Sequence, residues 1–286
     1  MPPQHPPPRV HTAGAPAPFI DNLDIPREPL WFTPEFIERN LNTGAAKAIV
    51  GLGPSILFSG KEKQEAKEGP PISAVLKPDI SEPMTSLIEW ICGSIGRAIG
   101  APIAEPVGAL ITDEFAALDP RLKPCEVCGS RFQTGILPLL QEPLLPKPMR
   151  ESAWKLIAFD AYVQNLDRLL KNPNMGRAAN QIFAYDHDKA LSFVRDIAYD
   201  RETASNALWL DESRVHPLAR HVRRSTMCDK IPQTFSILDE KWFSRLLEVT
   251  PIPWKDGLDN EIERIVDTLT DRARNLKWLT NLSKCL

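Results

Sequence analysis

The sequence has no long apolar run, and no stretch approaches the roughly 20 residues that are needed to cross a bilayer. Its beginning lacks a basic segment followed by an apolar one, which is the pattern of a secretory signal. We therefore expect a cytoplasmic protein that does not enter a membrane. A basic excess is also missing, because 34 Lys and Arg residues face 37 Asp and Glu residues. This balance argues against a dedicated binder of nucleic acid or of an anionic membrane surface.

Cysteine is scarce as well, with five residues at positions 92, 125, 128, 228 and 285. An odd and scattered set does not make a disulfide framework. Cys125 and Cys128 have the spacing of two zinc ligands, but no second pair of Cys or His follows at the usual distance. The interpretation we favour is a loop with two reduced thiols.

Proline, in contrast, is abundant, and nine prolines fall within the first 30 residues. This density leaves little scope for helix or sheet, so residues 1–30 are predicted to form a disordered or extended arm. Folded structure is predicted to begin near Trp31. Thr33 followed by Pro34 predicts the start of a helix, with Thr33 as its N-cap.

The periodicity of the apolar residues changes along the rest of the chain. Short apolar runs between Gly, Pro and charged residues predict strands at residues 48–50, 55–58, 73–76, 106–112 and 132–140. Helical spacing predicts helices at residues 84–99, 151–164 and 261–282. This order predicts an α+β fold with two lobes, a strand-rich one at residues 31–140 and a helical one at residues 141–286.

Two polar segments in the second half are the most informative about function. Asp167 is followed five residues later by Asn172, and Asp186 stands at the end of a strand predicted at residues 181–185. Phosphoryl-transfer enzymes use such a set, in which one Asp orients the acceptor hydroxyl while an Asn and a second Asp hold Mg²⁺ on the nucleotide phosphates. Lys77 ends an apolar strand, where its ammonium group can reach phosphates, and Glu89 on the following helix is placed to pair with it.

The order of these residues is more informative than any one of them. A strand Lys, a helix Glu, an Asp with a following Asn, and then a strand Asp is the order found in protein kinases. The sequence therefore predicts a kinase that uses ATP and Mg²⁺. A glycine-rich phosphate loop is lacking, and we assign its place to the turn at residues 42–47, where Thr43 and Gly44 would cover the phosphates through backbone N–H groups.

The same segments carry a family resemblance. The segment Phe159–Asn172, with Ala184–Asp188 after it, resembles the HipA-like kinases, whose catalytic loop reads N-x-D-R followed by His and then Asn. The segments at residues 75–77, 88–91 and 99–106 are similar to that family in the same order. The family is distantly related to the phosphatidylinositol kinases.

The resemblance implies a two-lobed kinase fold with ATP between the lobes. It implies that Lys77 binds the α- and β-phosphates with Glu89 as its partner. It also implies that Asp167 is the catalytic aspartate and that Asn172 and Asp186 are the Mg²⁺ ligands. For the neighbouring polar residues the favoured interpretation is structural; these residues are Asp160, His187 and Asp188.

Leu169 departs from the family pattern, because the family has His at this position and Leu can neither hydrogen-bond nor titrate. We favour transfer of the γ-phosphoryl group to Ser or Thr of a protein. The departure keeps open a nucleotide-binding pseudokinase or scaffold, and the likeness to lipid kinases keeps open a small-molecule or lipid acceptor. An interaction module that uses the proline-rich arm is a further alternative. The resemblance also allows an antitoxin or regulatory protein as partner.

Overall fold

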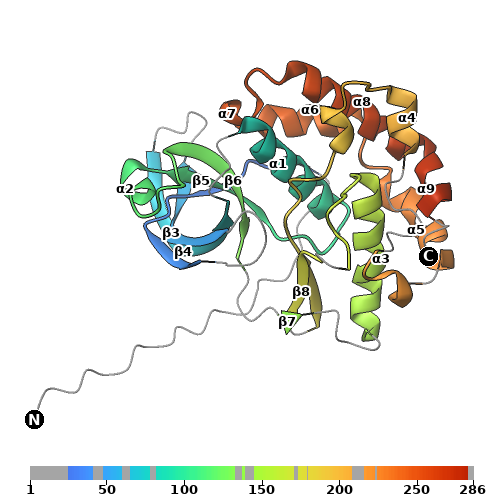
Figure 1. Cartoon of the computed structure of the whole chain (residues 1–286), viewed down its shortest axis with the longest axis horizontal. Coiled ribbons are helices and arrows are strands. Elements are labelled where there is room, and N and C mark those ends of the chain that lie inside the picture. Colours follow the sequence, from blue (N-terminus) through green and yellow to red (C-terminus); the bar gives the residue numbers. More distant parts are fainter. Residues whose placement is uncertain are drawn as a thin grey trace, which may run out of the picture.

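Figure 1 shows the computed structural model of the chain, with strands β3 to β6 on one side and most of the helices on the other. The fold is therefore mixed α and β. The structure describes residues 25–40, 48–59, 65–77, 82–132, 137–138, 145–170, 173–178, 180–207, 216–222 and 224–282. Most of the predicted proline-rich arm lies outside these residues, and its last residue, Leu30, already belongs to a strand.

Six strands of the described chain form one sheet. They are β1 (Leu30–Phe32), β2 (Phe36–Asn40), β3 (Ile49–Ser59), β4 (Glu65–Leu76), β5 (Pro106–Ile111) and β6 (Cys125–Arg131). Their order is β1-β5-β6-β4-β3-β2, and β1 also pairs with β3, so the sheet closes into a small barrel. Its interior is apolar and is capped by Phe115 of the short helix α2 (Asp113–Ala116).

Buried and partly buried residues alternate along β4, and this alternation determines the face on which Lys77 lies. Ile72, Ala74 and Leu76 are buried in the barrel interior, and the residues between them are only partly buried. Because successive side chains of a strand point to opposite faces, Lys77 leaves the end of β4 on the face away from the barrel interior. That face is covered by helix α1 (Pro83–Ala98).

Helix α1 is buried along most of its length and begins with Pro83, whose fixed φ suits the first helical position. Gly93 allows the helix to lie close to β5, because a Cβ atom at Gly93 would stand 2.7 Å from Cγ of Pro106. The predicted helix at residues 84–99 is thus confirmed, and so are the strands predicted at residues 106–112 and 181–185, within a residue or two at their ends. The two strands predicted at residues 48–50 and 55–58 are one continuous strand, β3, and the strand predicted at residues 73–76 is the end of the longer β4.

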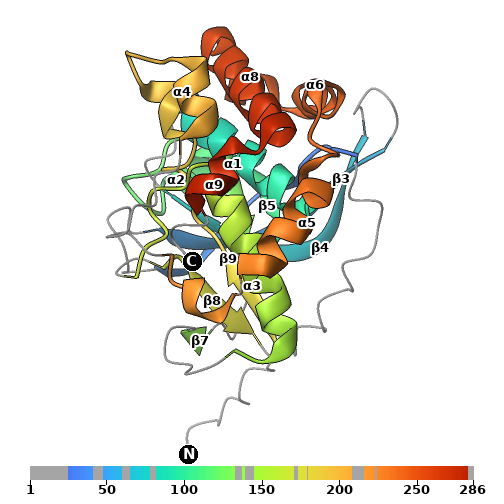
Figure 2. The same cartoon turned by 90° about the vertical axis from the view of Figure 1, so that its right-hand side faces the viewer.

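The second half of the chain is mainly helical. Its elements are α3 (Lys147–Tyr162), α4 (Arg201–Asn206), α5 (Arg224–Phe235), α6 (Glu240–Val249), α7 (Ile252–Lys255), α8 (Asp259–Asn275) and α9 (Lys277–Leu282), with a small sheet of β7 (Leu137–Pro138), β8 (Met175–Ala178) and β9 (Gln181–Ala184). Figure 2 shows α3, α5, α8 and α9 from the helical side. One continuous apolar core joins these helices to α1 and to Trp31 of β1.

Three further predictions of secondary structure are wrong. Thr33 does not start a helix; the residues after it form β2, because pairing with β3 satisfies their backbone groups. The helix predicted at residues 261–282 is two helices, since Leu276 adopts a left-handed conformation with φ of 48°. The strand predicted at residues 132–140 is not found as one element. β6 ends before this range, at Arg131, and among the described residues of the range only Leu137–Pro138 form a strand, β7.

The two cysteines with zinc-like spacing lie in β6 and not in a loop. Residues three apart on a strand point to opposite faces, so their thiols do not converge. Cys128 is fully buried, while Cys125 is partly exposed. The pair is therefore not arranged as two ligands of one metal ion.

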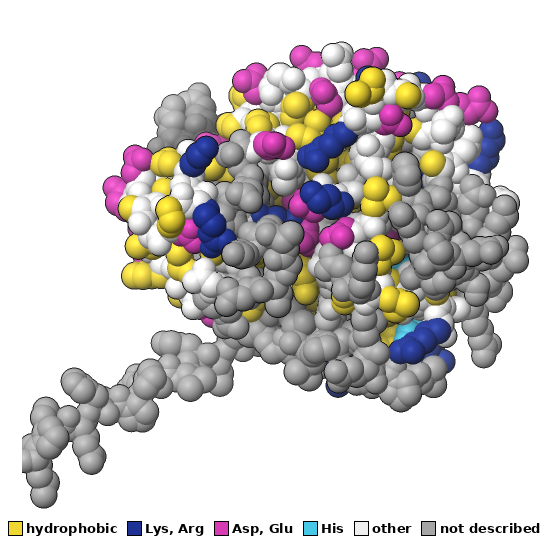
Figure 3. All heavy atoms as spheres, in the orientation of Figure 1, with side chains coloured by type: hydrophobic (Ala, Val, Ile, Leu, Met, Phe, Trp, Pro, Cys, Tyr) yellow, Lys and Arg dark blue, Asp and Glu magenta, His cyan; other side chains and the backbone are white. Residues whose placement is uncertain are grey.

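The surface carries charges of both signs. Figure 3 shows Lys and Arg side chains interspersed with Asp and Glu over the face seen there. This pattern agrees with the formal net charge of −3. Among the described helices, none has the length and apolarity required to pass through a membrane.

Candidate active site

Lys77 and Glu89 form an ion pair at the junction of β4 and α1. Nζ of Lys77 donates to Oε1 of Glu89 over 3.1 Å, and both side chains are largely buried. The pairing expected from the sequence is thus present. It depends on α1 lying across the end of β4, as described above.

Two further carboxylates surround the same ammonium group. Lys77 donates to Oδ1 of Asp186, and Oδ2 of Asp188 lies 3.2 Å from Nζ. Burial by itself would lower the pKa of Lys77, but the carboxylates around it raise the pKa well above its ordinary value. Lys77 is therefore held as a cation among three acidic side chains.

Glu89 is bound from a second direction by the segment that carries Asp186. The backbone N–H of His187 donates to Oε1 of Glu89 over 3.0 Å, and Nδ1 of His187 lies 3.2 Å from Oε2. Burial acts to raise the pKa of Glu89, but Lys77 and His187 together hold it far below its usual range. One buried carboxylate thus joins α1, the end of β4 and the segment after β9.

Asp186 has an unusual backbone conformation, with φ of 66°, that directs its carboxylate toward Lys77. Burial raises the pKa of Asp186, and the neighbouring carboxylates add to this, although Lys77 opposes it. An additional cation placed near such a carboxylate would stabilise its charged form.

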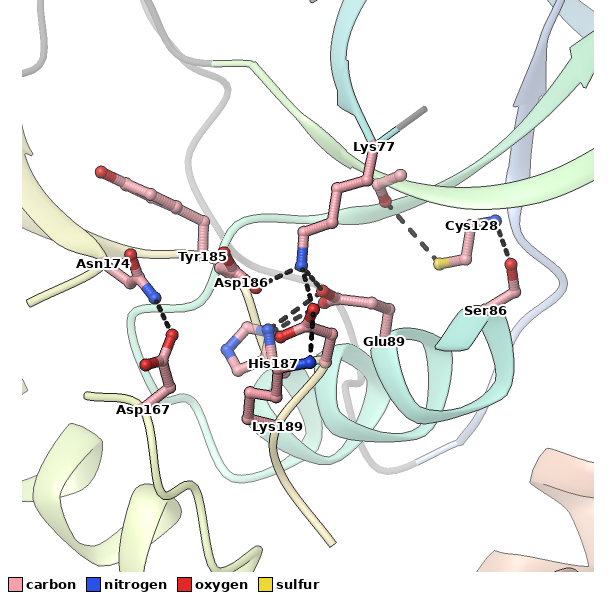
Figure 4. A network of polar contacts seen from close by, with 12 residues as sticks. Lys77, Ser86, Glu89, Cys128, Asp167, Asn174, Tyr185, Asp186, His187 and Lys189 are labelled. Carbon is pink, nitrogen blue, oxygen red and sulfur yellow. Dashed lines mark hydrogen bonds and ion pairs between the residues drawn. The ribbon is translucent and has the colours of Figure 1, made fainter. Parts of the chain in front are cut away.

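Asp167 lies in the loop after α3, where its partner is Asn174. Nδ2 of Asn174 donates to Oδ2 of Asp167 over 3.0 Å. The backbone oxygen of Asn174 accepts from the N–H of Tyr185, the residue before Asp186. Figure 4 shows the Asp167–Asn174 pair on one side of Asp186, with Lys77 and Glu89 on the other.

Asp160 at the end of α3 organises this loop. Its Oδ1 accepts from Nδ2 of Asn165 over 3.0 Å, and its Oδ2 accepts from Nε of Arg168 over 2.7 Å. Oδ1 of Asn165 in turn accepts from the backbone N–H of Asp167. The loop is therefore tied to the helix on either side of Asp167.

Arg168 extends the connection to the segments that follow. Its guanidinium is fully buried, and Nη1 donates to the backbone oxygens of Pro173, Asn174 and Tyr185 over 3.3, 2.5 and 3.2 Å. A rigid guanidinium suits this task because its donors have fixed directions. Arg168 thus fixes the backbone of Asn174 and that of Tyr185, the residue before Asp186.

His216 completes the surroundings of Asp160. Its Nδ1 accepts from the backbone N–H of Leu218 over 3.1 Å, so Nε2 carries the proton and donates to Oδ2 of Asp160 over 3.0 Å. Burial lowers the pKa of His216, even though Asp160 acts against this. Burial acts to raise the pKa of Asp160, but Arg168 and His216 hold it below its ordinary value.

The structure brings together four of the residues predicted from the sequence: Lys77, Glu89, Asp167 and Asp186. The other three, Thr43, Gly44 and Asn172, lie outside the described residues. Leu169 packs against the apolar core instead of entering the polar network. Sequence reasoning missed Asn174, although it stands directly before strand β8 and therefore at a fixed position.

The donor groups suit a magnesium ion held on a nucleotide. Three carboxylates face one ammonium group, so the cluster has an excess of negative charge. Among the residues with a described placement, no three His, Cys, Asp or Glu side chains are grouped to hold a metal ion by themselves. A magnesium ion on a nucleotide commonly uses only one or two protein side chains together with phosphate oxygens.

The comparisons with known proteins agree with this arrangement. The fold resembles that of the Helicobacter pylori proinflammatory kinase CtkA, with a TM-score of 0.55 and 13% sequence identity, covering 90% of this chain and 98% of that one. No curated protein sequence matches the chain significantly. Residues 75–276 match the HipA-like kinase family. The chain belongs to this family of kinases.

Proposed function

We propose that this protein transfers the γ-phosphoryl group of ATP to the hydroxyl group of Ser or Thr in a protein, with Mg²⁺ as cofactor. The observation that supports this most strongly is the convergence of Lys77, Glu89 and Asp186 next to the Asp167–Asn174 pair. The proposal includes a two-lobed arrangement, with the barrel and α1 on one side of the nucleotide and the helical part on the other.

Lys77 would exchange part of its carboxylate contacts for the α- and β-phosphates of ATP. Glu89 would keep the ammonium group in place, because it is itself fixed by His187. Asp186 and Asn174 would supply oxygen ligands to Mg²⁺, whose chemistry here is to neutralise charge on the phosphates. Asn172 remains a second candidate for the amide ligand.

Asp167 would act on the acceptor. Its carboxylate would accept a hydrogen bond from the hydroxyl group and hold the oxygen in line with the γ-phosphorus. As the new P–O bond forms, the bond between the γ-phosphorus and the bridging oxygen breaks. ADP leaves with that oxygen, and the hydroxyl proton passes to Asp167. Asn174 would orient the Asp167 carboxylate through the contact that already exists.

The test is incubation of purified protein with labelled ATP and Mg²⁺, with and without cell lysate, followed by mass spectrometry of phosphorylated residues. We expect label on a Ser or Thr residue with the wild type and none with Asp167→Ala or Asp186→Ala, both of which should remain folded. Full labelling by either variant would overturn the assignment of residues. Label found only on lipid or small molecules would overturn the protein acceptor.

A second candidate function is nucleotide binding without transfer. It is favoured by Leu169, which stands where the family has His and packs into the core. ATP binding with no label on any acceptor in the same experiment would support it.

A further inference from the structure

Helix α1 carries two neighbouring residues that face different parts of the molecule. Glu89 points to Lys77 in the candidate site, and Trp90 points to the segment between α6 and α7. Successive residues of a helix are about 100° apart around its axis, so a fixed direction for one side chain fixes the other. The rotation of α1 therefore determines whether Glu89 meets Lys77.

Trp90 is held by a buried hydrogen bond to the second half of the chain. Its Nε1 donates to Oγ1 of Thr250 over 3.0 Å, and the same hydroxyl donates to the backbone oxygen of Leu246 over 2.7 Å. Trp90 and Thr250 are each about 3% exposed. The bond links α1 to the end of α6, 160 residues further along the chain.

Trp254 of α7 makes the second part of this link. Its ring lies 5.9 Å from that of Trp90 and 5.5 Å from that of Trp31 in β1, measured between centroids. Its Nε1 donates to the backbone oxygen of Glu126 in β6 over 3.0 Å. The ring is fully buried, so α7 is wedged between α1 and the barrel. Figure 1 shows α7 beside α1 and β6 at the junction of strands and helices.

The barrel holds α1 from another side. Gly93 lies against Pro106 with no room for a larger side chain, and Oγ of Ser86 accepts from the backbone N–H of Cys128 over 3.1 Å. A helix packed in this way cannot turn or swing out without breaking buried contacts. The packing on both sides of α1 therefore fixes the side of the helix from which Glu89 reaches Lys77.

We propose that Thr250, Trp90 and Trp254 are positioning residues for nucleotide binding, which act by holding α1 in the rotation that pairs Glu89 with Lys77. The segment from α6 to α7 thus takes part in keeping Glu89 next to Lys77. The inference rests on the proposed function, because it assigns the Lys77–Glu89 pair to ATP.

The experiment compares Thr250→Val with the conservative Thr250→Ser by two measurements. One is the dissociation constant of Mg-ATP in a binding titration. The other needs no nucleotide: the rate at which an acylating reagent modifies Lys77, measured by mass spectrometry relative to Lys189, whose side chain is 57% exposed. Trp90→Phe serves as a second variant, since it keeps a ring and loses the N–H group.

We expect Thr250→Val to weaken Mg-ATP binding about fivefold to tenfold, the change that corresponds to one lost hydrogen bond, and to raise the acylation rate of Lys77 similarly. Thr250→Ser should restore both values. Added to Glu89→Gln, Thr250→Val should have no further effect on Mg-ATP binding, because its action passes through Glu89. The matched control is Trp278→Phe, a buried tryptophan that donates to the backbone of Arg272 far along the chain from α1. It should lower the melting temperature and leave both measurements unchanged.

A Thr250→Val variant with a lower melting temperature but wild-type binding and acylation would overturn the inference. Additive effects in the Glu89→Gln background would do the same. If the wild type binds no ATP, the proposed function fails, and acylation of Lys77 still decides whether the α6–α7 segment positions the pair.

Discussion

Nδ2 of Asn174 lies 3.0 Å from the carboxylate of Asp167, and the backbone of Asn174 is bound by both Arg168 and Tyr185. Asn174 therefore connects the candidate catalytic aspartate to the segment that carries Asp186. This relationship favours Asn174, seven residues after Asp167, as an amide ligand of the proposed magnesium site.

The first prediction separates the two asparagines. We expect Asn174→Ala to lower the turnover number about 10- to 100-fold and to raise the Mg²⁺ concentration needed for half-maximal rate. The turnover number of Asn172→Ala should stay within about threefold of the wild-type value, as expected for a side chain that does not bind the magnesium ion. The measurement is the initial rate as a function of Mg²⁺ at saturating ATP. The reverse order of effects would return the assignment to Asn172.

Three of the four residues that the structure brings together were predictable from the regular element that carries or precedes each of them. Lys77 follows a strand with alternating burial, Glu89 lies on a helix with a clear period, and Asp186 follows β9. Local patterns determine such positions. The sequence could not predict the role of Arg168 or His216, because each contacts groups that only the folded chain brings near. Asn174 was missed for a different reason, since the spacing of the kinase pattern predicts Asn172 and no local pattern indicates that the side chain of Asn174 contacts Asp167.

The second prediction concerns the buried pair of Asp160 and Arg168. We expect Asp160→Ala to lower the free energy of unfolding by about 3–5 kcal/mol, because it leaves the guanidinium buried without its counter-charge. Chemical denaturation followed by fluorescence measures this change. The control is Glu240→Gln, which removes the exposed partner of Arg274 and should cost less than about 1 kcal/mol. Equal effects of the two substitutions would show that the buried network does not hold the loop.

The third prediction concerns the three carboxylates around Lys77. Lys77→Met leaves Glu89, Asp186 and Asp188 facing one another without the ammonium group, so we expect the free energy of unfolding to fall by about 2–4 kcal/mol. Added Mg²⁺ should raise the melting temperature of this variant more than that of the wild type.

The comparison for Lys77→Met uses calorimetry in MgCl₂ and NaCl solutions of equal ionic strength. Lys189→Met is the matched control, because Lys189 contacts Asp188 at 3.6 Å but is mostly exposed. It should give a melting temperature and a response to Mg²⁺ close to those of the wild type. An equal response to Mg²⁺ in all three proteins would contradict the view that excess negative charge at this site attracts the ion.

The last prediction is the pH dependence that His216 imposes on stability. Its folded-state pKa is lowered by burial, so the native protein keeps the ring neutral at pH values where the unfolded chain takes up a proton. The stabilisation is complete above the unfolded pKa of about 6.5 and is lost as the pH falls toward the lower folded value. In His216→Gln this part of the pH dependence should vanish, while a side-chain N–H group that can reach Asp160 is kept. The measurement is the free energy of unfolding of both proteins between pH 7.5 and pH 5, with the difference between them expected to shrink on acidification. A constant difference over this range would mean that His216 takes up its proton equally in the folded and unfolded chains.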